Sequence, residues 1–294
     1  MDKNDRNILT STAEGIAIHR ALEMLLPPSM RVCEDQYASH FLSPPFVALL
    51  NDPDRIKILI DRAAKEVPGV NGAIITRVKF FDDYLNQCLE DGFRQIVLLG
   101  AGFDSRAYRF DNIQLKVIVY ELDRLDIQNQ KISVLKRLFG QIPKHVSFVS
   151  VDFESENFGK KLIDAGFNQD QPAFFIWEGV TMYLCADEVD ATLSFISNKC
   201  AAGSRIIFDY FPATIVEGTC NLPEAQGLRE RVNAINEKFC FGIAPNRVND
   251  LLESHDFSVI LNVNAQKLKS RYFKDAAEYR PVSSLFNFAV AEVQ

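Results

Sequence analysis

One stretch sets the architecture of this chain: Gln95-Ile-Val-Leu-Leu-Gly-Ala-Gly-Phe-Asp-Ser-Arg-Ala-Tyr-Arg109. It opens with the aliphatic run 96–99 and breaks into Gly100-Ala101-Gly102, a pattern typical of a buried parallel strand that ends in a tight turn. Glycine in such a turn removes the Cβ that would keep a ligand away from the backbone. The stretch therefore predicts an α/β sheet with a ligand-binding turn at the end of this strand.

A second aliphatic run follows after about twenty residues, the spacing typical of a nucleotide-binding unit. It covers Lys116 to Tyr120 and continues into Glu121-Leu122-Asp123. Carboxylates at this point lie where a nucleotide presents its ribose hydroxyls. We therefore expect Glu121 and Asp123 to bind a ribose, and residues 100–102, with Asp104 at the start of the next helix, to form the floor of the site.

Strands and helices alternate from residue 95 onward, which is the pattern of a doubly wound parallel sheet with ligands at the carboxyl ends of its strands. The expected strands are Gln95–Leu99, Lys116–Tyr120, Val146–Val151, Ala173–Trp177, Arg205–Tyr210, Ser258–Val263 and Phe286–Val293.

The sheet starts late, because the first 93 residues contain helical patterns and no strand that ends in a glycine turn. One helix is expected at Thr12–Leu26, where Pro27-Pro28 stops it, and a second at Asn71–Glu90. We therefore predict an N-terminal helical cap at residues 1–93 and a nucleotide-binding domain at residues 94–294.

Residues 211–246 interrupt the alternation with several prolines and glycines around a helical pattern at 224–238. This segment is too long for an ordinary connection. Long insertions after the carboxyl end of a strand commonly form lids or substrate walls. We expect this lid, together with the cap, to cover an acceptor pocket.

Composition narrows the class of protein. The chain has 294 residues, 47% of them hydrophobic, and 39 acidic against 32 basic residues give a net charge of −7. A nucleic-acid-binding surface would need a basic face, so no nucleic-acid partner is expected. Six cysteines without a Cys-x-x-Cys pair, no signal peptide and no membrane-spanning run indicate a cytoplasmic protein without a membrane partner. Four histidines without His-Glu-x-x-His spacing predict no metal site.

Residues 99–109, followed by Tyr-Glu-Leu-Asp at 120–123, resemble the leucine carboxyl methyltransferase family. The segment Trp177-Glu-Gly-Val-Thr-Met-Tyr-Leu184 is similar to the Glu-Gly-x-x-Met-Tyr-Leu signature of that family. The resemblance covers the chain from about Ala13 onward. It implies a Rossmann-like class I fold dependent on S-adenosyl-L-methionine (SAM), with SAM as cofactor and an antiparallel last strand.

The resemblance also implies roles for single residues. Arg77, in Thr-Arg-Val-Lys-Phe-Phe-Asp-Asp83, matches the family's arginine that holds the methionine carboxylate of SAM. A guanidinium suits that task because it binds a carboxylate through two parallel hydrogen bonds. Spacing alone favours the alternative, an arginine on the solvated face of a helix.

Two further strand ends carry matching residues. Asp152 and Phe153 match the family's contacts with the adenine amino group and ring, although Asp152 could instead cap a helix at 154–165. Glu178 is expected to stabilise the sulfonium or the methionine amino group, since both are cationic. Tyr183 is expected to line the acceptor side.

The implied reaction is methyl transfer to a carboxylate or hydroxyl oxygen of a small molecule, such as a carboxylic acid or a phenol. A carboxylate is already ionised at neutral pH and needs no general base, whereas a phenol would be helped by one. The four histidines are expected to be structural, so we name no base. Within the family, the carboxylate at a protein C-terminus is an alternative acceptor.

Two other classes remain as alternatives. An NAD-dependent oxidoreductase would use Gly100-x-Gly102-x-x-Ser105 as its dinucleotide fingerprint, but Asp104 would then face the pyrophosphate at the helix start. A non-catalytic SAM-binding protein would retain the fold without the reaction, because a fold does not determine an activity.

Overall fold

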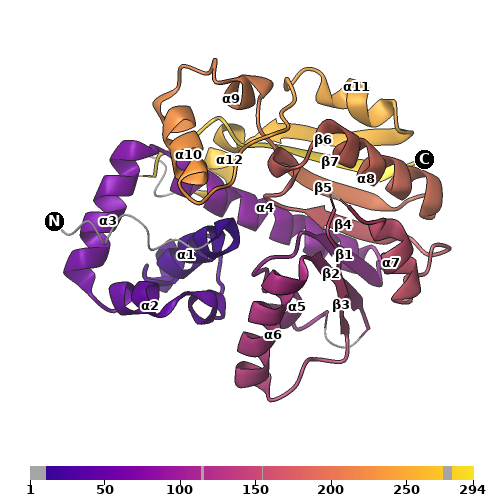
Figure 1. Cartoon of the computed structure of the whole chain (residues 1–294), viewed down its shortest axis with the longest axis horizontal. Helices are drawn as coiled ribbons and strands as arrows, with labels where there is room; N and C mark the ends of the chain where they lie inside the picture. The colour runs from indigo at the N-terminus through magenta and orange to yellow at the C-terminus, as the bar shows by residue number, and fades with distance from the viewer. Residues whose placement is uncertain (1–10, 114–115, 154, 274–279) are drawn as a thin grey trace.

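A single seven-stranded sheet forms the centre of the computed structural model, which describes residues 11–113, 116–153, 155–273 and 280–294. The strand order is β3-β2-β1-β4-β5-β7-β6 (Figure 1). Strands β1 to β5 pair in parallel, and β7 runs antiparallel to both β5 and β6. The expected doubly wound α/β sheet with an antiparallel last strand is confirmed.

All seven expected strands are present, with small shifts at their ends. The strands are β1 (Gln95–Leu99), β2 (Ile118–Asp123), β3 (Val146–Ser150), β4 (Ala173–Trp177), β5 (Arg205–Tyr210), β6 (Phe257–Asn264) and β7 (Asn287–Val293). The prediction for the second strand was wrong at both ends, because pairing with β1 continues from Ile118 to Leu122. Glu121 therefore lies inside the strand.

Helices cover both faces of the sheet, which explains why every residue of β1 and β4 is buried. One face packs on α4 (Val70–Glu90), α5 (Arg106–Arg109) and α6 (Leu125–Phe139). The other packs on α7 (Phe158–Asp164), α8 (Ala186–Lys199) and α11 (Val248–Glu253). The carboxyl ends of β1 and β4 flank the point where the strand order reverses, which is where such sheets bind ligands.

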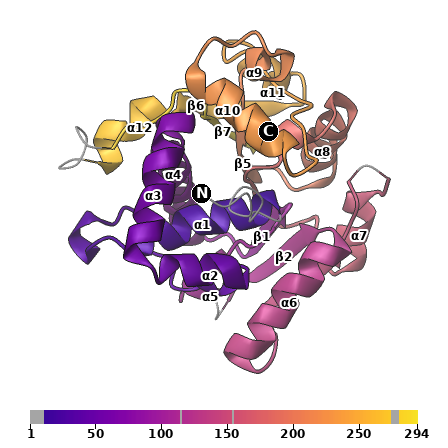
Figure 2. The ribbon, with the colours of Figure 1, turned by 60° about the vertical axis from the view of Figure 1, so that its left-hand side comes forward.

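The N-terminal helices gather beside the sheet (Figures 1 and 2). They are α1 (Thr12–Met24), η2 (Pro28–Met30), η3 (Ala38–Phe41), α2 (Pro44–Leu50) and α3 (Pro53–Glu66). Helix α4 instead belongs to the layer on the sheet, because its Phe80 ring stacks on Phe288 of β7 with ring centres 5.5 Å apart.

The segment 211–246 contains two helices, α9 (Ala213–Glu217) and α10 (Pro223–Asn233). The helix expected at 224–238 is therefore shorter than predicted. After it the chain returns to η4 (Thr181–Tyr183), where the backbone N–H groups of Cys240 and Phe241 donate to the carbonyl of Met182 over 2.8 and 3.2 Å. The segment is thus held against the residues that follow β4.

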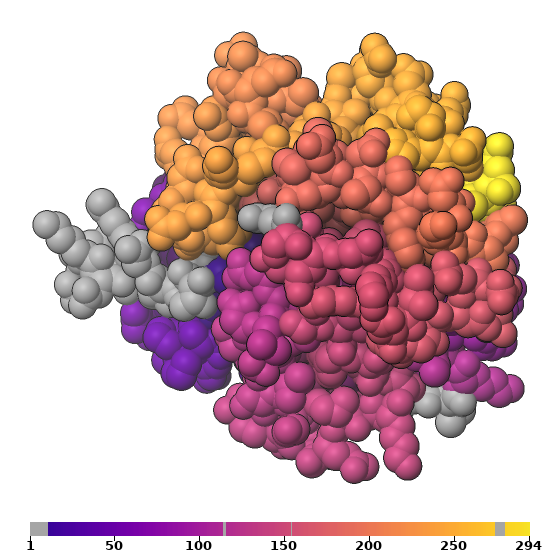
Figure 3. Space-filling view, turned by 45° about the vertical axis from the view of Figure 1, so that its right-hand side comes forward, coloured from indigo at the N-terminus to yellow at the C-terminus, as the bar shows by residue number. Residues whose placement is uncertain are grey.

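The remaining helix, α12 (Ala265–Tyr272), lies between β6 and β7 in the chain and contacts α4. Within the described ranges, no helix has both the length and the apolar character needed to cross a membrane. Figure 3 shows one broad face, formed by the middle of the chain in magenta to salmon and by the C-terminal third in orange to yellow.

Candidate active site

The turn after β1 has a backbone that only glycine fits easily. Gly100 has a φ of +67°, and a Cβ at this position would collide with Cγ2 of Val180. The next residue, Ala101, donates its N–H to the carbonyl of Leu122 over 2.8 Å. The turn is therefore fixed against β2 on one side and against the residues after β4 on the other.

Asp123 ends β2 directly beside this turn. Its Oδ2 accepts the N–H of Gly102 at 2.5 Å, and its Oδ1 accepts the N–H of Arg124 at 2.7 Å. Burial raises the pKa of Asp123, while the two backbone donors oppose that rise. The structure thus brings together the glycine turn and one of the two predicted ribose ligands.

Glu121 occupies a different environment from the one expected. Its side chain is fully buried, where Oε2 lies 2.6 Å from Nζ of Lys131 and Oε1 accepts the Tyr108 hydroxyl at 2.9 Å. Burial raises its pKa, although Lys131 and Tyr108 act in the opposite direction. The expected contact of Glu121 with a ribose does not fit this environment, because both oxygens are already engaged beneath helix α6.

Arg77 of α4 reaches the carboxyl ends of β4 and β5. Its Nε donates to Oε1 of Glu178 at 3.0 Å, and its Nη1 donates to Oδ2 of Asp209 at 2.5 Å. Only 2% of the side chain is exposed, so the alternative of an arginine on a solvated helix face is wrong. Within the described part of the chain, the buried Nη2 has no hydrogen-bond partner.

Glu178 is shared between two guanidinium groups, since its Oε2 also lies 2.7 Å from Nη1 of Arg106. Burial acts to raise the pKa of Glu178, but Arg106 and Arg77 outweigh it and hold the pKa below its ordinary value. Glu178 is therefore an anion enclosed between cations at the end of β4.

Arg106 links this pair to the start of helix α5. Its Nη1 lies 2.5 Å from Oδ2 of Asp104, and its Nε lies 2.7 Å from Oδ1 of Asp82. Burial acts to raise the pKa of Asp104. The positive charge of Arg106, followed by those of Lys131 and Arg20, outweighs burial and lowers the pKa to about 2. Asp104 is thus ionised and bound to a protein cation next to the glycine turn.

Asp152 and Phe153 follow β3 at the same edge of the sheet. The N–H of Val151 donates to the carbonyl of Asp123 over 2.9 Å, which brings this strand end beside the predicted ribose ligand. Asp152 does not cap the next helix, because α7 begins at Phe158 and is capped by the Asn157 side chain. Glu154, where that helix was expected to begin, lies outside the described residues.

Tyr183 packs against the lid segment. Its ring centre lies 5.5 Å from that of Phe239, and the Phe239 ring lies 5.1 Å from Phe211. Burial, followed by the charge of Glu237, raises the pKa of Tyr183 well above its ordinary value. The phenol is therefore protonated and can act as a hydrogen-bond donor.

The sequence and the fold of this chain can be compared with those of known proteins. The sequence pattern of the leucine carboxyl methyltransferase family matches residues 13–197, which are more than half of this chain of 294 residues. The chain belongs to the leucine carboxyl methyltransferase family. The resemblance stated from the sequence is thereby confirmed, and the matched range contains every predicted site residue from Arg77 to Tyr183.

Relatives within the curated proteins carry names of one class. A protein of Mycobacterium avium (strain 104), provisionally named an S-adenosyl-L-methionine-dependent methyltransferase, is 32% identical over 209 residues, which are 69% of this chain and 65% of that protein. A protein of the same name from Mycobacterium tuberculosis (strain ATCC 25177 / H37Ra) is 30% identical over 214 residues, 68% of this chain and 64% of that protein. The match thus spans just under two thirds of the length of these relatives.

Solved structures share the fold. A protein of Thermobifida fusca YX, provisionally described as a methyltransferase, superposes with a TM-score of 0.58 at 17% identity and covers 82% of this chain and 89% of its own. A DUF574 family protein of Streptomyces avermitilis gives 0.57 at 14% identity, covering 82% and 91%. Together with the strand order, these likenesses show the Rossmann-like fold of the methyltransferases.

The family's sequence signatures did not reveal every charged group of the site. Asp209 was not predicted, although a single acid in the apolar strand Arg205-Ile-Ile-Phe-Asp-Tyr210 is a signal that could have been noticed. Asp82 and Arg106 stood within quoted motifs without an assigned role. Their function becomes visible only when α4 and α5 are brought together.

The N-terminal helices are bound directly to the glycine turn in this member of the family. Arg20 of α1 donates from Nη2 to the carbonyl of Phe103 at 2.5 Å, and its Nε lies 2.9 Å from Oδ2 of Asp35. The Ser105 hydroxyl donates to the same oxygen of Asp35 at 2.6 Å. Any movement of α1 therefore changes contacts of the turn.

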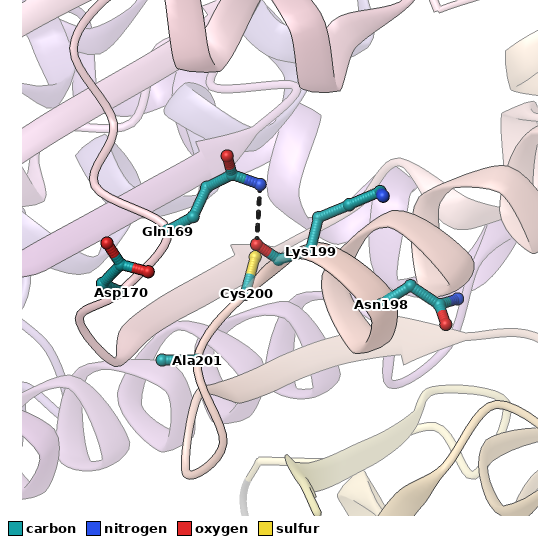
Figure 4. A pocket seen from close by; sticks show the side chains of 6 residues that line it. All are labelled: Gln169, Asp170, Asn198, Lys199, Cys200 and Ala201. Carbon is teal, nitrogen blue, oxygen red and sulfur yellow. Dashed lines mark hydrogen bonds between the residues drawn. The ribbon is translucent and has the colours of Figure 1, made fainter.

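A separate hollow of about 500 Å³ lies at the opposite edge of the sheet (Figure 4). Its lining comes from Gln169 and Asp170, which precede β4, and from residues 198–201, which precede β5. Gln169 donates to the carbonyl of Lys199 at 2.8 Å across it. Ligands of doubly wound sheets bind at carboxyl ends, so this hollow is not the predicted cofactor site.

Proposed function

We propose that this protein is a SAM-dependent O-methyltransferase that methylates a carboxylate or hydroxyl oxygen of a small-molecule acceptor. One observation carries the proposal: Arg77 is buried between the carboxyl groups of Glu178 and Asp209 at the ends of β4 and β5, and its Nη2 has no hydrogen-bond partner among the described residues. These strand ends lie beside the glycine turn, and family membership supports the same class of activity.

The residues present fit the cofactor. Nη2 of Arg77 is a buried donor that a methionine carboxylate would satisfy, and Gly100, with a φ of +67°, ends β1 in a turn at the edge of the sheet where such folds bind ligands. We assign Asp123 to the ribose, Asp152 and Phe153 to the adenine, and Glu178 to the cationic part of the methionine. The enclosed carboxylate of Glu178 suits a positive charge because it is held in its ionised form.

Bound SAM supplies a methyl group on a positively charged sulfur. The residues of this chain then mainly align the acceptor and exclude water, and alignment alone can contribute roughly 7–11 kcal/mol to lowering a barrier. A carboxylate acceptor needs no proton removed. Tyr183, which stays protonated, is placed to donate a hydrogen bond to the acceptor and to hold its orientation.

A small acceptor is supported by the closure of the acceptor side. The segment 211–246 is held on Met182 by two backbone hydrogen bonds and packs Phe239 on Tyr183. We propose that this segment and helices α1 to α3, the described part of the predicted cap that lies before α4, enclose the acceptor. The alternative of a protein C-terminal carboxylate would need this segment to open.

The other classes receive less support. An NAD pyrophosphate would meet Asp104, an anion with a pKa of about 2, at a helix of only four residues. A non-catalytic protein that had lost its cofactor site would be expected to lack some of the charged residues of that site. This chain has Arg77, Asp123, Asp152 and Glu178.

The test uses SAM carrying a radioactive methyl group and a panel of carboxylic acids, phenols and peptides that end in a leucine carboxylate. A methyl ester releases volatile methanol in mild alkali, whereas a methyl ether does not. We expect label on a small acid or phenol and none on the peptides. Label on peptides alone would favour the protein-carboxyl alternative, and labelled nitrogen or carbon products would contradict O-methylation.

A further inference from the structure

We propose that Asp209 is a positioning residue, which fixes the Arg77 guanidinium so that Nη2 faces the carboxylate of the cofactor. The inference rests on the proposed function, in which Arg77 binds that carboxylate. No signature of the sequence pointed to Asp209, which lies one residue before the end of β5 and is fully buried.

Both oxygens of Asp209 are engaged in the site. Oδ2 accepts Nη1 of Arg77 at 2.5 Å, and Oδ1 accepts the N–H of Gly179 at 2.5 Å. The carboxylate thereby joins the helix that carries the arginine to the turn that follows β4. Its own pKa is raised by burial, which Arg77 and the Gly179 N–H oppose.

Gly179 completes the seat for the guanidinium. Its φ is +71°, and a Cβ at this position would lie 3.3 Å from both Nη1 and Nη2 of Arg77. The guanidinium therefore lies closely against this turn. With Nε bound to Glu178 and Nη1 bound to Asp209, Nη2 is the terminal nitrogen left to meet a ligand.

This geometry gives the two carboxylates different tasks. Glu178 is shared with Arg106 and is 9% exposed, so it can also meet the cationic part of a ligand. Asp209 is 1% exposed at its side chain, and its two oxygens accept from Arg77 and from the Gly179 N–H. Asp209 therefore acts on the ligand through Arg77.

The test compares two ligands that differ in the group Arg77 binds. S-adenosylhomocysteine contains the amino-acid carboxylate, and 5′-methylthioadenosine retains the adenosine and the sulfur but lacks it. In Asp209→Asn the new amide can turn its N–H₂ toward Nη1, so two donors face each other and the guanidinium shifts. Calorimetry should show affinity for S-adenosylhomocysteine falling by about tenfold to a hundredfold. Affinity for 5′-methylthioadenosine should stay within about twofold of wild type.

Two controls separate positioning from general damage. Glu224→Gln makes the same acid-to-amide change at a buried residue that binds Ser283, and it should leave both affinities unchanged. In an Arg77→Ala background, Asp209→Asn should have no further effect on S-adenosylhomocysteine. If Asp209→Asn does not fold, Gly179→Ala can replace it, because the added Cβ would lie against Nη1 and Nη2 of Arg77. This variant should likewise weaken the binding of S-adenosylhomocysteine and leave that of 5′-methylthioadenosine nearly unchanged.

The inference would be overturned if Asp209→Asn weakened the binding of both ligands equally or left both affinities unchanged. It would also be overturned if Asp209→Asn lowered the affinity for S-adenosylhomocysteine as much in the Arg77→Ala background as in wild type. Failure of the wild-type protein to bind S-adenosylhomocysteine at all would overturn the proposed function, and this inference with it. The two failures are distinguishable, because the first needs a wild-type protein that binds.

Discussion

The carboxylate of Asp123 binds the backbone of the glycine turn and is also the predicted ligand of the ribose. Its Oδ2 holds the N–H of Gly102 and its Oδ1 holds the N–H of Arg124. A ribose hydroxyl would add a donor to an anion that is already oriented, which is the arrangement expected of a preorganised site.

Replacing Asp123 by Ala should weaken SAM binding by about 1.5–3 kcal/mol, the range for a hydrogen bond to a charged group. Calorimetric titration with SAM measures the change. Asp126→Ala, which removes an exposed acid three residues further along, is the matched control and should bind as wild type. A loss restricted to the acceptor, with SAM affinity intact, would place this carboxylate elsewhere.

Single residues show where sequence reasoning reached its limit. Spacing favoured a solvated Arg77, and only the family motif indicated a buried one. Its partners, Glu178 and Asp209, are 101 and 132 positions away, so local pattern contains no information about them. The buried partners of Glu121 were hidden for a related reason, because Lys131 and Tyr108 lie on separate helices.

At the scale of elements, strands with clear end signals were predicted well. The bounds of β1, β4 and β5 agree with the prediction. The apolar run of β1 ends at Gly100, and that of β4 lies between Pro172 and Glu178-Gly179. Strand β2 runs past its predicted end because Glu121 is paired with the buried Lys131, so a charged residue can lie inside this strand. The helix after Pro223 ends early, and Asn236 has a positive φ of 60° that no nearby proline or glycine announces.

His19 of α1 lies against α4. Its Nδ1 lies 2.9 Å from Nδ2 of Asn71 on α4, which donates to it when the ring is neutral. Burial first, and then the charges of Arg231 on α10 and Arg77 on α4, lower the pKa of His19 to about 4. Protonation of this ring in the folded chain is therefore opposed by burial and by two neighbouring cations.

The sign of the pH effect follows from the lowered pKa. An unfolded chain binds a proton at His19 near pH 6.5, whereas the folded chain does so only near pH 4. The free energy of unfolding should therefore fall as pH is lowered from about 6.5 to 4, by about 1–3 kcal/mol from this group.

Urea unfolding at several pH values, compared with His19→Gln, measures this contribution. The difference in free energy between the two proteins should change across that interval and stay constant above pH 7. His40→Gln, at an exposed histidine of η3, is the control and should follow the wild-type curve. Parallel curves for wild type and His19→Gln would show that the ring is not the group responsible.

At the scale of the whole molecule, charged side chains connect the cap to the far side of the switch point. The chain of contacts starts at Arg20 and Asp35, continues through Ser105, Arg109, Asp82 and Arg106, and ends at Glu178, Arg77 and Asp209. Buried charges of this kind are costly unless every member is paired. Their concentration beside the glycine turn is therefore better explained by ligand binding than by stability.

Topology was the most predictable property at this scale, because the alternation of strands and helices leaves few arrangements open. The placement of the cap on the turn was not predictable, since it depends on Arg20 reaching a backbone carbonyl 83 positions away.

The central claim is that the glycine turn and the cluster around Arg77 bind SAM. Isothermal titration of the protein with SAM, and separately with NADH, tests it most directly. We predict saturable binding of SAM at one site per chain and no heat of binding with NADH. Saturable binding of NADH without any binding of SAM would contradict the account.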